Sequence, residues 1–132
     1  ELLELAGAPR GQGHALAAAT LADGRAWRKF QEICEAQGGM RTPPVAPFRR
    51  DISTARSGFV LGIDNRRLAR IAKLAGAPKV ACAGIDLHVR VGDFVERGQP
   101  LYTLHAGSPG ALDYAAEYAL TQATTVHVAE DA

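Results

Sequence analysis

The stretch AGIDLHVRVGDFVERGQPLYTLH, residues 83–105, decides the fold because it places strand patterns and tight turns in one short segment. Apolar and polar side chains alternate from residue 85 to residue 91, which is the period of a half-buried β-strand. This pattern predicts one apolar face made of Ile85, Leu87, Val89 and Val91. Gly92 and Asp93 favour a turn into a short return strand at residues 94–95, and Gly98 with Pro100 favours a second reversal before a strand at residues 101–105. The stretch therefore predicts a small, closely folded β-unit.

The segments on either side of this unit supply further strands and two helices. Strand patterns occupy residues 49–55, 59–63 and 124–128. Helical spacing predicts a helix at residues 66–75, capped by Asp64 or Asn65 and closed by Gly76. A second helix is expected at residues 111–121, after the capping sequence Ser108-Pro109. Residues 48–132 thus indicate an α+β domain.

Residues 1–40 indicate a separate helical segment. We expect helices at residues 1–6 and 14–22, and a third that Asp23 caps and Gly38 and Gly39 end. Residues 41–47 hold three of the seven prolines and predict an extended linker. The chain starts without Met or a signal-peptide pattern, in what resembles the middle of a helix. We therefore expect a fragment of a longer protein, whose first helices pack on structure upstream.

The composition is that of an ordinary globular protein, and it argues against several classes of function. The 132 residues are 47% hydrophobic and 22% charged with a net charge of +1, which gives no electrostatic reason for a nucleic acid or an anionic membrane as partner. No apolar run approaches the ~18 residues of a membrane span. Cys34 and Cys82 have no second Cys or His at zinc-ligand spacing. We expect two reduced thiols in a cytoplasmic protein without a structural metal.

Isolated residues could carry chemistry, but none stands in a motif that such chemistry needs. Gly11-Gln12-Gly13 begins like a dinucleotide-binding loop, yet Leu16 stands where the third glycine belongs and no strand precedes it. No nucleophile-elbow pattern surrounds the serines, which are Ser53, Ser57 and Ser108. Asp86 and Asp93 would need a partner that the sequence does not reveal. Surface or hydrogen-bonding roles are expected for the histidines, which are His14, His88, His105 and His127. We assign no catalytic, cofactor-binding or metal-binding residue.

The helix expected at residues 66–75 has a basic face that could bind phosphate. This basic face consists of Arg66, Arg67, Arg70 and Lys73. Basic side chains spread over two turns without a glycine-rich loop are more often a solvated face, and those near the helix end also complement its dipole. Anion binding and solvation both stay open as interpretations.

The run AGIDLHVRVGDFVERGQPLYTLHA, residues 83–106, resembles the C-terminal domain of the thymidine phosphorylase and pyrimidine nucleoside phosphorylase family. In that family an AGI segment leads into a Gly-Asp turn, and a GQPL-type strand ends in LHA. Two further matches come earlier in the same order, SGFV at residues 57–60 and LADGRAWRKFQEICEAQGG at residues 21–39. The resemblance implies that residues 1–40 are the last helices of a truncated α/β domain. It also implies that residues 48–132 form a small β-rich C-terminal domain of hammerhead or barrel-sandwich-like fold with two helices.

The resemblance also implies a function for the parent protein. Family members cleave a pyrimidine nucleoside such as thymidine with phosphate, giving the free base and the pentose 1-phosphate. They use a Lys-His-Ser motif and a phosphate loop that lie upstream of the matched region, and this sequence contains neither. The implied role here is structural, without cofactor, with the rest of the phosphorylase chain as partner in a homo-oligomer. The connection at residues 76–82 is shorter than is common in the family, which leaves open the branch that acts on AMP.

A carrier or interaction module is the alternative from a different functional class. The run GDFVERGQPL also resembles the turn-rich half of biotinyl and lipoyl carrier domains. Those domains attach the cofactor to a lysine at a hairpin tip. Lys29 and Lys73 fall in expected helices and Lys79 falls in Pro78-Lys79-Val80, so none has that setting. The similarity therefore supports a small β-sandwich topology more than it supports a carrier role.

Overall fold

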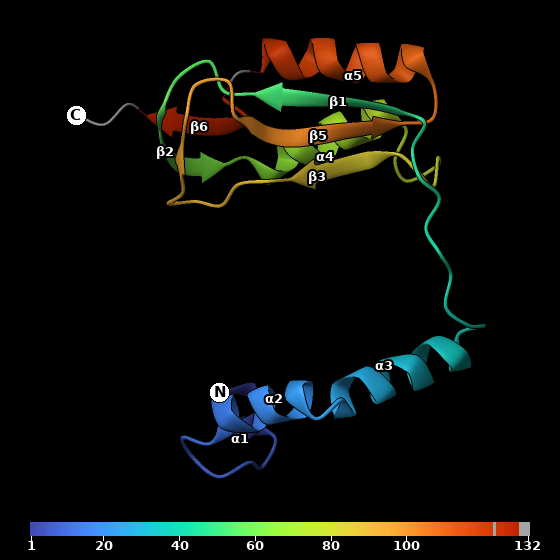
Figure 1. Cartoon of the computed structure of the whole chain (residues 1–132), viewed down its shortest axis with the longest axis vertical. Coiled ribbons are helices and arrows are strands. Elements are labelled where there is room, and N and C mark those ends of the chain that lie inside the picture. The colour runs from blue at the N-terminus through green and yellow to red at the C-terminus, as the bar shows by residue number, and fades with distance from the viewer. Residues whose placement is uncertain (123, 130–132) are drawn as a thin grey trace. The chain divides into compact units, whose positions relative to one another are not determined.

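The chain divides into two compact units, Glu1–Thr42 and Pro43–Ala132. The computed structural model describes residues 1–122 and 124–129, and Figure 1 labels the elements of both units. Unit 1 contains three helices, α1 (Leu2–Leu5), α2 (Gly13–Ala22) and α3 (Arg25–Ala36). Unit 2 contains the strands and the two remaining helices.

No N-cap side chain of unit 1 forms a capping hydrogen bond, but carboxylates from other positions accept backbone N–H groups where α2 and α3 begin. The Glu4 carboxylate accepts a hydrogen bond from the Gly13 N–H at 3.0 Å, which joins α1 to the start of α2. The N-cap of α3 is Gly24, with φ 78°, and not Asp23 as the sequence suggested, because the chain reverses through a left-handed residue that glycine accommodates. Asp23 still accepts a hydrogen bond from the Arg25 N–H at 3.0 Å. That backbone hydrogen bond, together with the Arg25 guanidinium, lowers the pKa of Asp23 below its ordinary value.

Unit 1 has almost no apolar interior of its own. The single buried residue in its three helices is Gly13. Large apolar side chains are exposed on every helix, namely Leu2, Leu3, Leu5, Leu16, Leu21, Trp27, Phe30 and Ile33. Helices of this length gain most of their stability from packing an apolar face, and the contacts between these helices leave their large apolar side chains exposed.

The strands of unit 2 form two antiparallel sheets, each with three strands among the described residues. Sheet A has the order β1 (Phe48–Ser53), β5 (Pro100–Ala106), β3 (Gly84–Leu87). Sheet B has the order β4 (Phe94–Val95), β2 (Gly58–Ile63), β6 (Val126–Ala129). In sheet A, Thr103 of the central strand stands opposite Asp51 on one side and Asp86 on the other.

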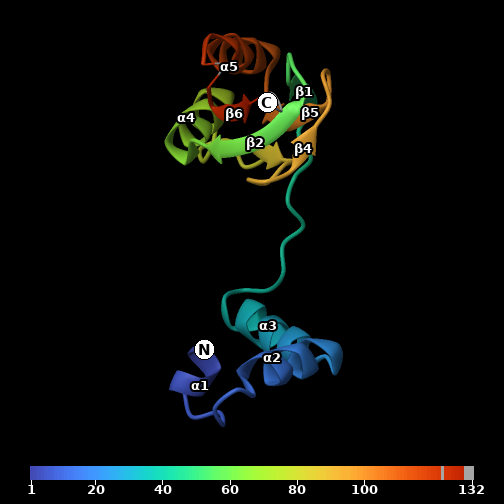
Figure 2. The same cartoon turned by 90° about the vertical axis from the view of Figure 1, so that its left-hand side faces the viewer.

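Two helices of unit 2 lie against each other beside the strands (Figure 2). The carboxylate of Asp64 caps α4 (Asn65–Ala75) by accepting from the Arg66 and Arg67 N–H groups at 3.0 and 3.1 Å. Ser108 caps α5 (Pro109–Thr121), which has Pro109 in its first turn as the sequence predicted. The buried stripe of α5 is the expected one, with Leu112, Ala115, Ala116 and Ala119. Both helices contribute to a core that also contains Val60 and Val95 from sheet B and Tyr102 and Leu104 from sheet A.

The segment at residues 85–91 differs from its expected form. Strand β3 ends at Leu87. The predicted apolar face was wrong at two positions, because Leu87 is 45% exposed and Val91 is 62% exposed. After β3 the chain leaves sheet A. The His88 N–H still bonds to Leu101 O, but the Gly92 N–H bonds to Val60 O in sheet B.

The short return strand was also placed with the wrong neighbour by the sequence pattern. Strand β4 pairs with β2, with Phe94 opposite Phe59, and not with β3 or β5. Residues 83–105 therefore do not form the single, closely folded β-unit that the sequence predicted, because β3 and β5 lie in sheet A and β4 lies in sheet B. The broader prediction of an α+β architecture is confirmed.

Candidate functional site

The basic face of α4 does not converge on a common point. Arg67 lies 3.3 Å from the Asp64 carboxylate and also contacts the Thr124 hydroxyl. The guanidinium of Arg70 stacks over the ring of Tyr118, 5.3 Å from its centroid. Arg66 and Lys73 are exposed and form no ion pair with a described residue. Half of the basic face is thus engaged within the domain, which leaves two separate cations and no preformed anion cradle.

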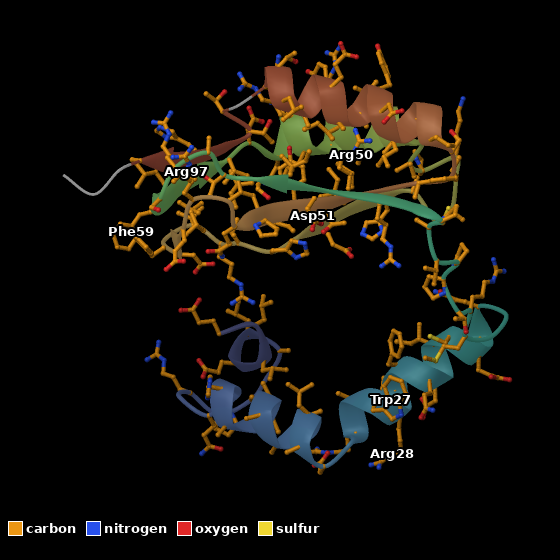
Figure 3. The ribbon with its side chains drawn as sticks, turned by 45° about the horizontal axis from the view of Figure 1, so that its top comes forward. Trp27, Arg28, Arg50, Asp51, Phe59 and Arg97 are labelled. Atoms are coloured by element: carbon orange, nitrogen blue, oxygen red, sulfur yellow. The ribbon has the colours of Figure 1, made fainter. Side chains whose placement is uncertain are left out.

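Two of the four histidines lie on the outer face of sheet A, opposite the face that α5 covers. The Thr103 hydroxyl donates to Asp51 Oδ1 at 2.6 Å and lies 2.7 Å from His88 Nε2. Because the single hydroxyl proton goes to Asp51, His88 must donate through Nε2. Figure 3 shows Asp51 on one side of β1 and Arg50 on the other, the side of α5.

The second histidine on this face stands beside a carboxylate. His105 Nε2 lies 3.0 Å from Asp86 Oδ2, close enough for a charge contact, although the direction of approach does not make a hydrogen bond. The sequence did not reveal a partner for Asp86, and the pairing of β3 with β5 places His105 beside it. The Thr103–Asp51 and His105–Asp86 contacts link neighbouring strands of sheet A. A cross-strand bracing role follows for this face.

The remaining residues singled out from the sequence lie apart from one another. His14 is exposed on α2, and His127 is exposed on β6. The Ser57 hydroxyl accepts a hydrogen bond from the Arg97 N–H at 2.9 Å, and the Asp93 carboxylate accepts one from the Arg90 N–H at 2.7 Å. Both side chains therefore stabilise turns. Among the residues that the structure describes, no group of three or more His, Cys, Asp or Glu side chains could hold a metal ion.

The lysines and the glycine pair occupy ordinary structural positions. Lys29 pairs with Glu32 along α3, and Lys73 lies on α4. Lys79 stands in the turn after α4 and before β3, which is not a turn between two strands. Gly11 and Gly13 connect α1 to α2, so a helix precedes them where a nucleotide-binding loop needs a strand.

A cleft of about 420 Å³ opens between the end of β1, the end of α5 and strand β6. Its walls are mixed in polarity, and their apolar residues include Ile52, Leu101, Leu120, Val126 and Val128. Tyr102 of β5 also lines the cleft, although the residue as a whole is only 2% exposed. Burial raises the pKa of Tyr102 to about 12.

Exposed apolar side chains gather at two places outside the cleft. On α3, Trp27 and Phe30 stack with ring centroids 5.7 Å apart and are 53% and 49% exposed. Trp27 and Arg28 leave this helix in different directions (Figure 3). On sheet B, Phe59 and Phe94 meet edge to face across β2 and β4, with ring centroids 5.2 Å apart. Each place exposes two neighbouring aromatic side chains to solvent.

None of the described helices is both long enough and apolar enough to cross a membrane. Cys34 and Cys82 are free thiols, one in each unit.

Comparison with known proteins assigns the chain to a family. Residues 59–125 match the family model described as the pyrimidine nucleoside phosphorylase C-terminal domain. A relative from Polaromonas sp. named "Putative thymidine phosphorylase" is 71% identical over the whole chain, and similarly named proteins from Acidovorax sp. and Cupriavidus necator are 57% and 60% identical over 100% and 91% of it. The chain spans 26%, 26% and 23% of the length of these three relatives. The chain therefore belongs to the pyrimidine nucleoside phosphorylase family, and its residues 59–125 correspond to the C-terminal domain of that family.

Proposed function

We propose that this chain is the C-terminal part of a thymidine phosphorylase. The parent enzyme cleaves thymidine with phosphate to thymine and 2-deoxyribose 1-phosphate, a pentosyl transfer. The names and high identity of the relatives support this substrate, and their length supports a parent about four times as long as the chain. Residues 1–40 are then the last helices of the large α/β domain, and residues 48–132 are the domain that follows the linker.

The observation that supports this proposal most strongly is that the helices of unit 1 bury almost no apolar side chain among themselves. Trp27, Phe30 and Ile33 recur on one side of α3 and are each about half exposed. Burying such a side chain contributes roughly 1.5–3 kcal/mol, so leaving several exposed would make these helices unstable on their own. The rest of the parent chain is the partner that covers them.

The role of unit 2 in the parent is structural. It has a complete apolar core, while its described polar residues form caps, turns and cross-strand contacts instead of a nucleophile and base in one cleft. The domain stabilises the α/β domain and helps to set its closure or the contacts between subunits of a homo-oligomer. The free thiols of Cys34 and Cys82 fit a cytoplasmic enzyme.

Deleting residues 40–132 from the intact enzyme tests the structural role. The melting temperature should fall, or the mass of the assembly should change, because the deletion removes a surface on which the α/β domain rests. Unchanged stability, mass and turnover would refute the proposed role of the domain, even if the intact enzyme cleaves thymidine.

A further inference from the structure

The segment that joins the two units is held at both of its ends. At the upstream end, Gly39 closes α3 with φ 92°, and its N–H bonds to Cys34 O at 2.8 Å. At the downstream end, Ala46 is only 4% exposed, and β1 begins two residues later at Phe48 and pairs with β5. The residues between these two anchors are 40–45.

Residues 40–45 themselves make none of the contacts that hold a backbone in place. All six are exposed, with Met40 at 60% and Val45 at 77%. They belong to no helix or strand, and neither their backbone nor their side chains form a hydrogen bond with a residue that the structure describes. Pro43 and Pro44 have no N–H to donate and favour an extended chain. Deforming such a segment breaks no interaction of either unit.

The described turns of unit 2 are held differently, by backbone hydrogen bonds. The Thr54 N–H bonds to Gln99 O at 3.0 Å, and the Gly98 N–H bonds to Thr54 O at 2.9 Å, which fixes the turns after β1 and before β5 to each other. After α4, the Val80 N–H bonds to Gly76 O at 2.9 Å. These bonds have to break before either turn can take the extended form that an endoprotease binds. Residues 40–45 need no such opening.

We propose that residues 40–45 are a flexible tether, and the site at which an endoprotease cuts the chain and releases unit 2 as a folded domain. Hydrolysis of one peptide bond consumes one water and leaves a carboxylate on the upstream piece and an ammonium group on unit 2. The released domain keeps its core, because the described core residues all lie from Phe48 onward. The tether belongs to the chain itself, so the proposal holds whatever substrate the parent enzyme cleaves.

Limited digestion of the intact gene product with proteinase K, followed by mass spectrometry, tests the tether. Among the bonds of these 132 residues, one within the tether should be cut first, at least about tenfold faster than any bond after Ala46. A fragment that starts between residues 41 and 46 and contains β1 to β6 should then persist. First cuts in the turns at residues 54–57 or 96–99, or protection of the tether in the intact protein, would overturn the proposal. Thymidine turnover of the undigested protein is measured in parallel, so a wrong substrate and a wrong tether are distinguished.

A double variant shows whether the tether is always accessible. Pro43→Ala with Pro44→Ala restores two N–H groups that a protease can bind, so cutting within the tether should become several-fold faster while the urea midpoint of unit 2 stays the same. The matched control Pro100→Ala makes the same change at the exposed start of β5 and should leave the rate of cutting at the tether unchanged. Equal rates for the double variant and the wild type would mean that an opening step controls access, and would contradict the proposal.

Discussion

Arg50 of β1 and Asp113 of α5 form an ion pair with 2.7 Å between Nη2 and Oδ1, which ties sheet A to the helix that covers it. Both side chains are about half exposed, at 47% and 64%, so solvent screens the pair. The pair joins sheet A to α5, but an ion pair this exposed contributes little to the free energy of unfolding.

Removing this pair should therefore have a small effect. Arg50→Gln and Asp113→Asn should each lower the free energy of unfolding by less than about 1 kcal/mol, and the effect should shrink in high salt. A double-mutant cycle in urea measures the coupling between the two residues. A coupling of several kcal/mol would show that the contact is far better shielded than its exposure indicates.

The core of unit 2 should be much more sensitive than its surface. Leu104 of β5 is completely buried among both helices and sheet A, so Leu104→Ala should cost about 2–5 kcal/mol. Leu120 is the matched control, because it is 70% exposed and its change to alanine removes the same atoms. Leu120→Ala should cost less than about 0.5 kcal/mol. Equal shifts of the urea midpoint in the two variants would contradict the described core.

The start of α4 depends on a side-chain cap. Asp64 Oδ1 accepts from two backbone N–H groups, so Asp64→Ala should lower the free energy of unfolding by about 1 kcal/mol. Asp64→Asn keeps an accepting oxygen and should retain most of that stability. Thermal unfolding followed by circular dichroism measures the stability of both variants. An equally large loss of stability in Asp64→Asn would show that the effect comes from the charge of Asp64 and its contact with Arg67.

Alkaline pH should destabilise the fold through Tyr102. The pKa of its phenol is 10.0 in ordinary surroundings and about 12 in the folded protein. Below pH 10 the phenol is protonated in both states, while between pH 10 and about 12 the unfolded chain loses the proton first. The free energy of unfolding should then fall as the pH rises through this interval.

The comparison with Tyr102→Phe isolates this contribution from other groups that titrate at high pH. The variant should unfold at the same urea concentration as the wild type or a higher one below pH 10, and should lose less stability as the pH rises towards 12. Parallel pH profiles of the two proteins would show that the hydroxyl is not shielded from solvent.

The exposed face of α3 should matter only in the parent enzyme. Trp27→Gln removes an apolar side chain that is 53% exposed in this chain, so stability of the chain should change little. In the intact phosphorylase the same change should cost about 2–4 kcal/mol, because Trp27 would be covered there. The neighbouring Arg28→Gln serves as the control, since Arg28 leaves the helix in a different direction (Figure 3).

Local patterns predicted most elements of unit 2 because caps and periodicity act over a few residues. Asp64, Gly76 and Ser108 delimit α4 and α5 as expected, and the apolar stripe of α5 is buried as its spacing indicated. Strand partners depend on contacts far apart in the chain, so the pairing of β4 with β2 had no local signal. The exposure of Leu87, the last residue of β3, and of Val91, which lies beyond it, likewise had no local signal, because the alternation of apolar and polar residues continues past the point where the chain leaves sheet A.

The cleft could not be predicted from the sequence, for the same reason. Its walls come from β1, β5, α5 and β6, which only the folded domain brings together. The sequence also could not show that Thr103 would join Asp51 to His88 across the sheet.

Phosphate-dependent release of the base by the intact gene product, with the 132-residue chain assayed in parallel, is the most direct test of the proposed function. Thymidine, uridine and AMP are offered separately. We expect the intact protein to release thymine from thymidine only when phosphate is present, and the chain alone to release none. Turnover by the isolated chain, or turnover of AMP in place of thymidine by the intact protein, would contradict the proposed function.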